Sequence, residues 1–236
     1  MKIRVIMSAI LVTCCSVSFA QLEVKDPAEF FQSQQNPTFS GPQVGETLPP
    51  FPFTGYGNKH TDQELEVLAL AEGKPLLLFI QSEALQGMKG FERFEPSIIK
   101  PIQEKSDVDL RVITVFITDD RDQFEKNMYM ILWNEDYQEV TQLGVSPDGR
   151  DGPGSYGLNR NVFQTILMVK DGKVLYNFPI PQPVNTPDPY VLGALADLIG
   201  EDRETLKQWI NDGRSKRYEM MKKGKKGDMK KMKKSK

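Results

Sequence analysis

Residues 73–80 read Gly-Lys-Pro-Leu-Leu-Leu-Phe-Ile, and this stretch decides the expected fold. Gly-Lys-Pro can end a helix, and the five apolar residues that follow have the length of a strand buried on both faces of a sheet. Upstream, Thr61 and Glu64 have the spacing of a capping box, which predicts a helix over residues 61–71. We therefore expect a helix that leads directly into a central strand.

The sequence after this strand predicts alternating helices and strands. A helix is expected from apolar residues spaced by three and four, and Pro96 and Pro101 should kink or divide it. A second buried strand is predicted at residues 112–117, and another helix should begin near Asp119 and Asp120. The helix that follows the first strand has an apolar stripe, which consists of Phe91, Phe94, Ile98 and Ile102.

The C-terminal half of the sequence predicts a hairpin followed by helices. Two apolar runs at residues 166–169 and 174–178 flank Asp171-Gly172-Lys173, and Asp-Gly tolerates the positive backbone angles of a tight hairpin turn. Asp188-Pro189 should open a helix that Gly200 ends. A further helix is expected over residues 201–212.

This order of elements resembles that of thioredoxin-like proteins. Three stretches are similar to the redoxin and peroxiredoxin-related branch: residues 44–51 (Val-Gly-Glu-Thr-Leu-Pro-Pro-Phe), Gly73-Lys74-Pro75 before an apolar strand, and Tyr156-Gly157-Leu158 followed by residues 165–174. The resemblance spans about residues 44–199. It implies an α/β three-layer sandwich with a mixed central sheet and a C-terminal β hairpin.

The sequence departs from the family at the positions that carry its chemistry. Thiol exchange needs a thiolate nucleophile and normally a second cysteine two residues further on. The corresponding stretch here reads Ala84-Leu85-Gln86-Gly87-Met88. Depending on the register, the two cysteine positions fall on Ala84 and Gly87 or on Leu85 and Met88, so neither register offers a thiol.

A second departure concerns the cis-proline of the family, which holds the backbone that pairs with a substrate peptide. Val162-Phe163-Gln164-Thr165 stands where the resemblance implies Val-Pro-Thr-Thr. Cis peptide bonds are essentially a property of proline, so Phe163 is expected to have replaced this feature.

The N-terminus predicts an export signal over residues 1–20. It has a basic start, an apolar run over residues 5–12 and the small-residue exit Ser18-Phe19-Ala20. A second route is also open, because Leu11-Val12-Thr13-Cys14 resembles a bacterial lipoprotein box, although Thr13 departs from the family pattern. The expected location is therefore periplasmic or extracellular, with an envelope lipoprotein as the alternative.

Removal of this signal would leave a chain without thiols, because Cys14 and Cys15 are the only two cysteines. Residues 21–43 are polar and rich in Gln and Pro, which predicts a flexible N-terminal segment, with a hint of a short helix beginning at Asp26-Pro27. The thioredoxin-like domain is expected over residues 44–213, which can bury a core without disulfides.

Charge separates the chain into an acidic body and a basic tail. Residues 21–213 carry 16 basic and 30 acidic residues, a net charge of -14, whereas residues 214–236 carry 12 basic and 2 acidic residues, a net charge of +10. Gly213 is expected to end the last helix, and the composition of the tail predicts disorder. The tail could contact anionic surfaces through Lys222, Lys223, Lys225, Lys226, Lys230, Lys231, Lys233, Lys234 and Lys236.

Other candidate sites have simpler explanations. His60 is the only histidine and stands in a loop, without a nucleophile or an orienting group that could form a catalytic set. Asp119-Asp120-Asp122 and residues 148–152 do not fit a calcium loop, and helix capping and turn formation explain both. The tail methionines are interleaved with lysines, which oppose binding of copper. Residues 143–156 form the longest expected loop and lack a phosphate-binding ending.

These observations predict a thioredoxin-fold protein that has lost dithiol chemistry and acts as a binding or accessory module. No catalytic residue, cofactor or metal is expected. The partners considered are a protein or peptide at the former active-site edge around Ala84–Met88 and Phe163, and an anionic envelope surface at the tail; no specific nucleic acid is predicted. The alternative is a thiol-disulfide oxidoreductase or peroxidase-like enzyme of the redoxin family.

Overall fold

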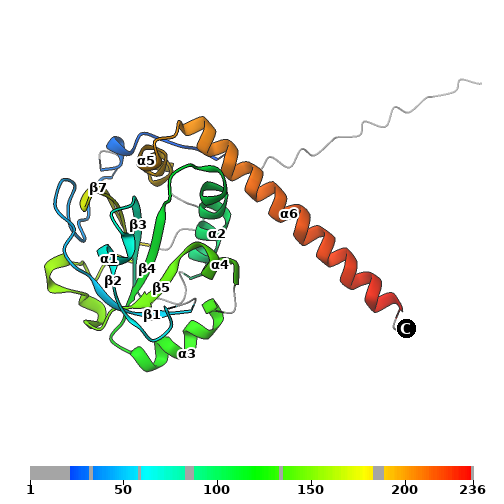
Figure 1. Cartoon of the computed structure of the whole chain (residues 1–236), viewed down its shortest axis with the longest axis horizontal. Coiled ribbons are helices and arrows are strands. Elements are labelled where there is room, and N and C mark those ends of the chain that lie inside the picture. The colour runs from blue at the N-terminus through cyan, green and yellow to red at the C-terminus, as the bar shows by residue number, and fades with distance from the viewer. Residues whose placement is uncertain are drawn as a thin grey trace, which may run out of the picture.

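A seven-stranded mixed sheet in the order β2-β1-β5-β4-β3-β6-β7 forms the centre of the protein (Figure 1). The structure is a computed structural model, which describes residues 22–31, 34–57, 60–82, 88–132, 135–182 and 189–234. The strands are β1 (Pro52–Tyr56), β2 (Glu64–Glu66), β3 (Leu76–Ser82), β4 (Arg111–Ile117), β5 (Gln142–Val145), β6 (Gln164–Lys170) and β7 (Lys173–Ile180).

Strand β3 is the central strand that residues 73–80 predict. All seven of its residues are buried. It pairs in parallel with β4, where Leu76 faces Arg111, and antiparallel with β6, where Leu76 faces Val169. A strand with neighbours on both edges and packed layers on both faces requires an apolar run, which is what the sequence provides.

The predicted hairpin is formed by β6 and β7. Asp171 and Gly172 connect the strands with φ angles of 52° and 70°. Positive φ at both positions is the requirement of a type I′ turn, whose twist matches that of the flanking strands.

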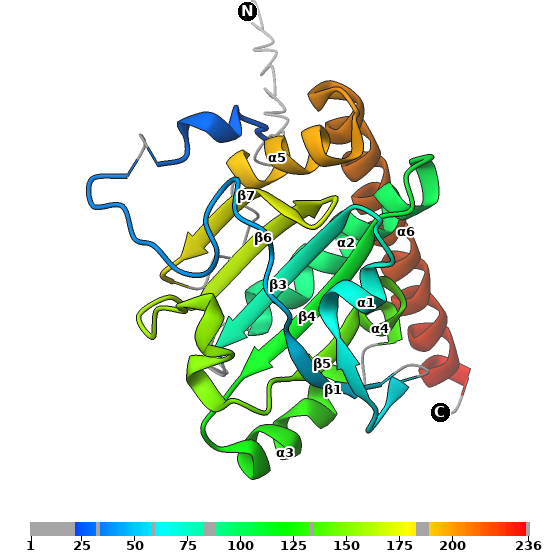
Figure 2. The same ribbon diagram turned by 60° about the vertical axis from the view of Figure 1, so that its left-hand side comes forward.

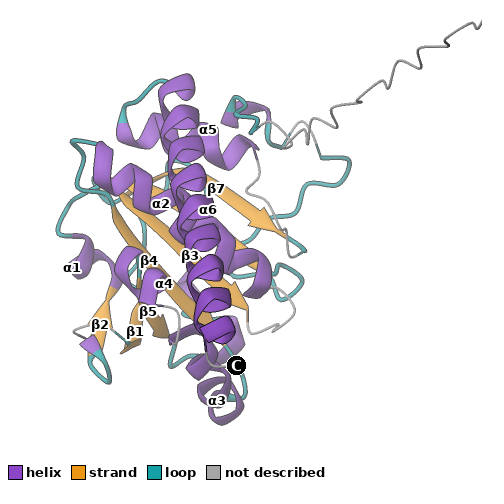
Figure 3. Cartoon of the chain, turned by 90° about the vertical axis from the view of Figure 1, so that its right-hand side faces the viewer, coloured by secondary structure: helices purple, strands orange, loops and turns teal. Residues whose placement is uncertain are grey.

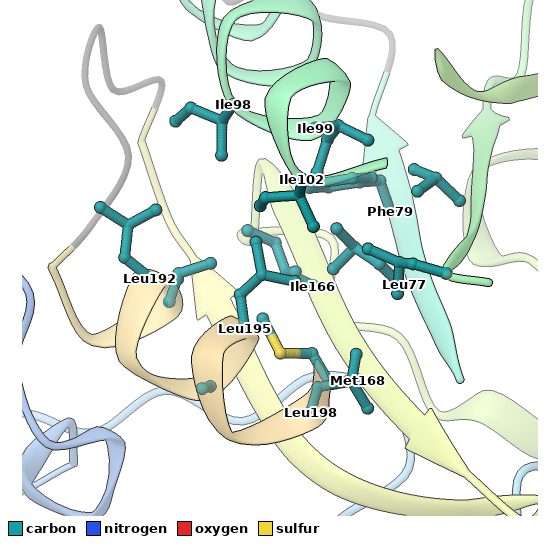
Figure 4. Close-up of a cluster of buried hydrophobic side chains, with 14 of the residues drawn as sticks. Leu77, Phe79, Ile98, Ile99, Ile102, Ile166, Met168, Leu192, Leu195 and Leu198 are labelled. Carbon is teal, nitrogen blue, oxygen red and sulfur yellow. The ribbon is translucent and has the colours of Figure 1, made fainter. Parts of the chain in front are cut away.

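Most of the helices cover one face of the sheet (Figure 2). There α2 (Met88–Lys105) and α5 (Pro189–Ile199) contribute side chains to one core with β3 and β6, and Figure 4 shows these side chains meeting. Ile102, Leu195 and Phe79 are among its fully buried members. The same core includes Leu206 and Ile210 of α6 (Arg203–Lys234). Helices α3 (Arg121–Leu132) and α4 (Glu135–Val140) connect β4 to β5.

The other face carries a thinner layer. The short helix α1 (Val67–Ala71) and the chain around Phe51 and Phe53 form a second apolar core against the sheet. The molecule therefore has three layers, and β4-β3-β6-β7 with their helices give it the thioredoxin-like fold that the sequence predicts. In the described parts of the chain, no helix combines the length and the hydropathy that crossing a membrane would require.

The predicted helix over residues 61–71 is only partly present. Leu65 pairs with Phe53 across β1 and β2, so the first half of this stretch is extended. The helix begins after Glu66, whose carboxylate accepts hydrogen bonds from the backbone amides of Leu68 and Ala69. Sheet pairing with a distant strand therefore overrides the local capping box.

The described part of residues 21–43 packs on the domain, in contrast to the flexible segment expected. Phe30 is only 4% exposed and contacts Phe178 and Tyr190 edge to face. Asp26 caps the predicted short helix, a 3-10 turn at Pro27–Glu29. The segment has no apolar periodicity because single residues, rather than a helical face, hold it to the core.

The C-terminal region also differs from the sequence-based expectation. Gly213 does not end the last helix, and residues 214–234, expected to be disordered, continue α6 away from the domain (Figure 1). The region is rich in lysine and methionine, which are good helix formers, and this outweighs the two interior glycines.

The expected loop at residues 143–156 is more regular than predicted. Its first residues complete β5, and short 3-10 turns lie at Gly149–Asp151 and Gly154–Tyr156. The Tyr156 hydroxyl donates a hydrogen bond to the Pro49 carbonyl oxygen at 2.9 Å, which holds this connection on the thinner face of the sheet.

Candidate functional site

The end of β3 and the start of β6 meet at the edge where the family resemblance places the redox chemistry. Gln81 and Ser82 close β3, and Phe163 and Gln164 lead into β6. We call these four residues the former redox edge. Gln81 and Gln164 face each other in the sheet register, so the edge is assembled from two strands that are distant in sequence.

The backbone of Phe163 is fully used inside the fold. Its amide donates to the Ile180 carbonyl oxygen at 2.9 Å, and its carbonyl oxygen accepts from the amide and the hydroxyl of Ser82 at 2.9 and 3.0 Å. The residue is 8% exposed, and the described residues contain no cis peptide bond. Phe163 therefore offers no free backbone group to an incoming peptide.

Two buried glutamines lie beside this backbone. Gln164 Nε2 donates to Gln81 Oε1 at 2.9 Å, and Gln81 Nε2 donates to the Ser82 carbonyl oxygen at 3.0 Å. Amide side chains are neither nucleophiles nor titratable groups at neutral pH, so this pair can hold the edge together but cannot exchange electrons or protons.

The predicted degenerate redox motif is only partly within the described residues. Ala84, Leu85, Gln86 and Gly87 lie outside them, and Met88 is the first residue of α2, with its side chain not described. The assignment of these positions to the former cysteines remains a prediction. Ser82 is the last residue of β3 and Met88 is the first residue of α2, so the motif falls between this strand and this helix, as the resemblance implies.

Ion pairs fix the loop at the same end of the sheet. Arg160 binds both carboxylate oxygens of Asp151 at 2.6 and 2.7 Å, and Asp119 Oδ1 accepts from the Arg150 amide at 2.9 Å. The hydrogen bond from Arg160 holds the pKa of Asp151 below its ordinary value. Asp120 caps α3 by accepting from the Gln123 amide at 2.9 Å.

These contacts give Asp119, Asp120 and Asp151 structural roles in this part of the fold. Where the structure describes the chain, no three His, Cys, Asp or Glu side chains come together as metal ligands would.

His60 lies away from the former redox edge. Its Nδ1 is 3.1 Å from Gln63 Oε1. It lines a polar pocket of about 400 Å³ together with Arg111 and Gln142, which begin β4 and β5. Because β3 and β4 run in parallel, this pocket is at the opposite end of the sheet from Ser82.

A buried polar cluster near β6 was not anticipated. Ser40 Oγ accepts from the hydroxyl of Thr165 at 2.8 Å and from the Asn159 amide at 3.1 Å. Asn177 Nδ2 donates to the carbonyl oxygens of Ser40 and Pro42, each at 2.8 Å. The signal that could have revealed it is the presence of Thr165 and Asn177 inside otherwise apolar strands.

The basic residues of the tail up to Lys234 lie on α6, which crosses α2 (Figure 3), and Lys236 lies outside the described residues. Pro101 and Gly213 are in contact at the crossing, and an apolar groove of about 120 Å³ runs beside them. Lys222 is exposed, and the helical backbone continues through the later lysines up to Lys234. Their binding role stays a prediction.

Comparison with known proteins shows similarity only among solved structures. No family model matches the sequence, and no curated protein matches it. A putative thiol:disulfide interchange protein DsbE from Chlorobium tepidum is 17% identical, with 72% of this chain and 97% of that chain covered and a TM-score of 0.45.

Two further structures have the same level of similarity. The thioredoxin domain of a thiol-disulfide oxidoreductase from Bacteroides vulgatus is 14% identical (66% and 98% covered, TM-score 0.47). The exposed lipoprotein thioredoxin of Streptococcus pneumoniae is 18% identical (64% and 98% covered, TM-score 0.43). The thioredoxin-like fold of this chain is assigned from its own strand order and helices.

Proposed function

We propose that this protein is an exported thioredoxin-fold module that binds a partner and does not use dithiol chemistry. The observation that carries the proposal is the position of the cysteines. Both lie in the predicted export signal, and no cysteine follows Cys15. Thiol exchange and peroxide reduction by this family both begin with a thiolate, so a chain cleaved after Ala20 has no nucleophile of that kind.

The geometry of the former redox edge supports this proposal. Phe163 pairs its backbone groups with Ile180 and Ser82, and the buried glutamines satisfy each other rather than activate a neighbouring group. These contacts stabilise the edge as part of the fold.

The competing function is that of a thiol-disulfide oxidoreductase or peroxidase that takes its cysteine from a partner. Insulin reduction and peroxide consumption by the protein beginning at Gln21 distinguish the two. We expect no turnover above the uncatalysed rate, and clear turnover would overturn the proposal. Two variants provide assay controls, Ala84→Cys/Gly87→Cys and Leu85→Cys/Met88→Cys, because each restores a cysteine pair in one of the two registers.

The proposed binding surface for an extended peptide or protein is the segment Ala84–Met88, because the backbone of Phe163 is already paired. A photo-crosslinking amino acid at Gln86 should capture a polypeptide from the exported fraction. The matched control is the same amino acid at Asp107, which is exposed near the opposite end of the sheet. Equal capture at both positions, or capture at neither, would argue against a site at this edge.

The tail is proposed to hold the acidic body at an anionic envelope surface. Each basic residue near such a surface contributes about 1 kcal/mol before screening. Binding to anionic vesicles should fall when the chain is truncated after Gly213 and when the ionic strength is raised, because salt screens exposed charges. Binding that is unchanged in both tests would contradict the tether.

A further inference from the structure

The part of α6 that leaves the domain has one side turned toward α2. Gly213, Lys216, Arg217 and Met220 line the groove between the two helices, together with Pro101 and its neighbours on α2. Successive residues of an α-helix are separated by about 100° around the axis, so these four positions share one side of α6. The opposite side faces away from the domain.

An apolar stripe lies on a different side of the helix, centred about 130° around the axis from the groove side. Tyr218 is 58% exposed, and by helical spacing the positions of Met221, Met229 and Met232 lie within an arc of about 80° that includes Tyr218. Lys225 interrupts the stripe. Four large apolar residues on one side of a helix that is otherwise dominated by lysine form the pattern of a basic amphipathic helix.

Most of the lysines lie on one flank of the stripe and on the side of the helix beyond it, and Lys231 is the single lysine on the other flank. Between Lys222 and Lys234 the helix carries eight lysines and a single acidic residue, Asp228. Such a helix complements a surface that offers negative charge at its outside and an apolar phase directly beneath. A lipid bilayer with anionic headgroups has both layers, whereas a soluble polyanion or an anionic wall polymer has only the charge.

We propose that residues 218–234 of α6 lie in the interface of an anionic lipid bilayer, with the Tyr218, Met221, Met229 and Met232 side toward the acyl chains. This rests on the tether proposed above and names its partner as the bilayer. The contact between Gly213 and Pro101 ties the helix to the domain, so the domain is held beside the bilayer.

The first test is cosedimentation of the protein beginning at Gln21 with two kinds of vesicle. One contains phosphatidylglycerol and phosphatidylcholine, and the other contains phosphatidylcholine alone. The stripe variant Met221→Ser/Met229→Ser/Met232→Ser keeps every charge. We expect it to bind the anionic vesicles about tenfold more weakly than the parent, because burial of apolar side chains adds to the electrostatic attraction.

The control variant is Met220→Ser, which removes a methionine from the groove side of the same helix. It should bind as the parent does. Far-UV circular dichroism and thermal unfolding show that the variants are folded. Equal binding by the stripe variant and the parent would overturn the proposal, since it would mean that charge alone holds the helix to the surface.

A second readout follows the depth of the helix. In a Tyr218→Trp variant, the new tryptophan adds its fluorescence to that of Trp133 and Trp209. On anionic vesicles this added fluorescence should shift to shorter wavelength and be quenched by brominated acyl chains. Preferential binding to soluble polyphosphate without such quenching would overturn the bilayer and favour a polymer. Insulin reduction tests only the proposed lack of redox chemistry, and vesicle binding tests only the contact with the bilayer. Failure of one proposal can therefore be recognised separately from failure of the other.

Discussion

Gly213 of α6 lies directly against the ring of Pro101 in α2. A Cβ atom placed on Gly213 would be 2.2 Å from Pro101 Cγ, far inside van der Waals contact. The proline ring is rigid, so the two helices cross here only because one of them has a glycine. This contact explains why a residue that is typical of a helix end stands inside a helix.

Gly213→Ala is therefore expected to destabilise the protein. Alanine gains about 1 kcal/mol of helix propensity over glycine, but overpacking of a close contact costs about 1–3 kcal/mol. In a Pro101→Ala background the 2.2 Å clash with Cγ is gone and only the 3.2 Å approach to the Cβ of residue 101 remains, so the same substitution should cost much less stability. Chemical unfolding of the parent, the two single variants and the double variant measures this coupling. Additive changes in the free energy of unfolding would show that residues 101 and 213 do not clash as the structure implies.

Asn177→Ala tests the buried cluster that holds the N-terminal segment. It leaves the carbonyl oxygens of Ser40 and Pro42 without their donor, at a cost of about 1–3 kcal/mol in the free energy of unfolding. The exposed Asn161 provides the control, since Asn161→Ala should change stability by less than about 0.5 kcal/mol. Similar effects of the two substitutions would mean that residues 40–42 are not held by this side chain.

The Arg160–Asp151 pair predicts a dependence of stability on acid pH. The pKa of Asp151 is lowered by its hydrogen bond from Arg160. A carboxylate with a lowered pKa in the folded state stabilises it above the ordinary pKa of about 3.9, and this contribution is lost as the pH falls through the lowered value. Asp151→Asn should therefore lose less stability than the parent between about pH 5 and pH 2.

The measurement for this pair is the unfolding midpoint in denaturant across that range. Asp148→Asn, on the same loop, is the matched control and should follow the parent. Parallel curves for Asp151→Asn and the parent would show that the pair does not contribute to the stability of the folded state.

Gly224→Ala/Gly227→Ala is expected to strengthen the outer part of α6. Each glycine costs a helix about 1 kcal/mol relative to alanine, so the variant should have a higher helix content by far-UV circular dichroism. Gly154→Ala, in a loop with open space around the position, should leave helix content unchanged. An unchanged signal in the double variant would mean that the glycines do not limit this helix.

The sequence predicted the elements whose signals are local. The β6–β7 turn depends on two adjacent residues, Asp171 and Gly172, and β3 is a continuous apolar run. By contrast, β1 and β5 are short and pair through contacts such as Thr54 with Val145, which are far apart in sequence. Such strands have almost no periodicity of their own, so the helix expected over residues 61–71 and the loop expected over residues 143–156 were partly wrong.

The candidate site shows the same division. Residues 84–88 predict the loss of the cysteines, and Phe163 predicts the replacement of the proline. The pairing of Gln81 with Gln164 and the closure of the Phe163 backbone by Ser82 depend on two strands meeting in three dimensions. Polar residues at the ends of buried strands are the only sequence signal for that edge.

The predicted removal of both thiols with the export signal is tested most directly by the intact mass of the purified protein before and after treatment with an alkylating reagent under denaturing conditions. We expect a chain that begins at Gln21 and gains no mass from the reagent. A mature chain that retains Cys14 or Cys15 and becomes alkylated would contradict it, because a nucleophile for thiol chemistry would then be present.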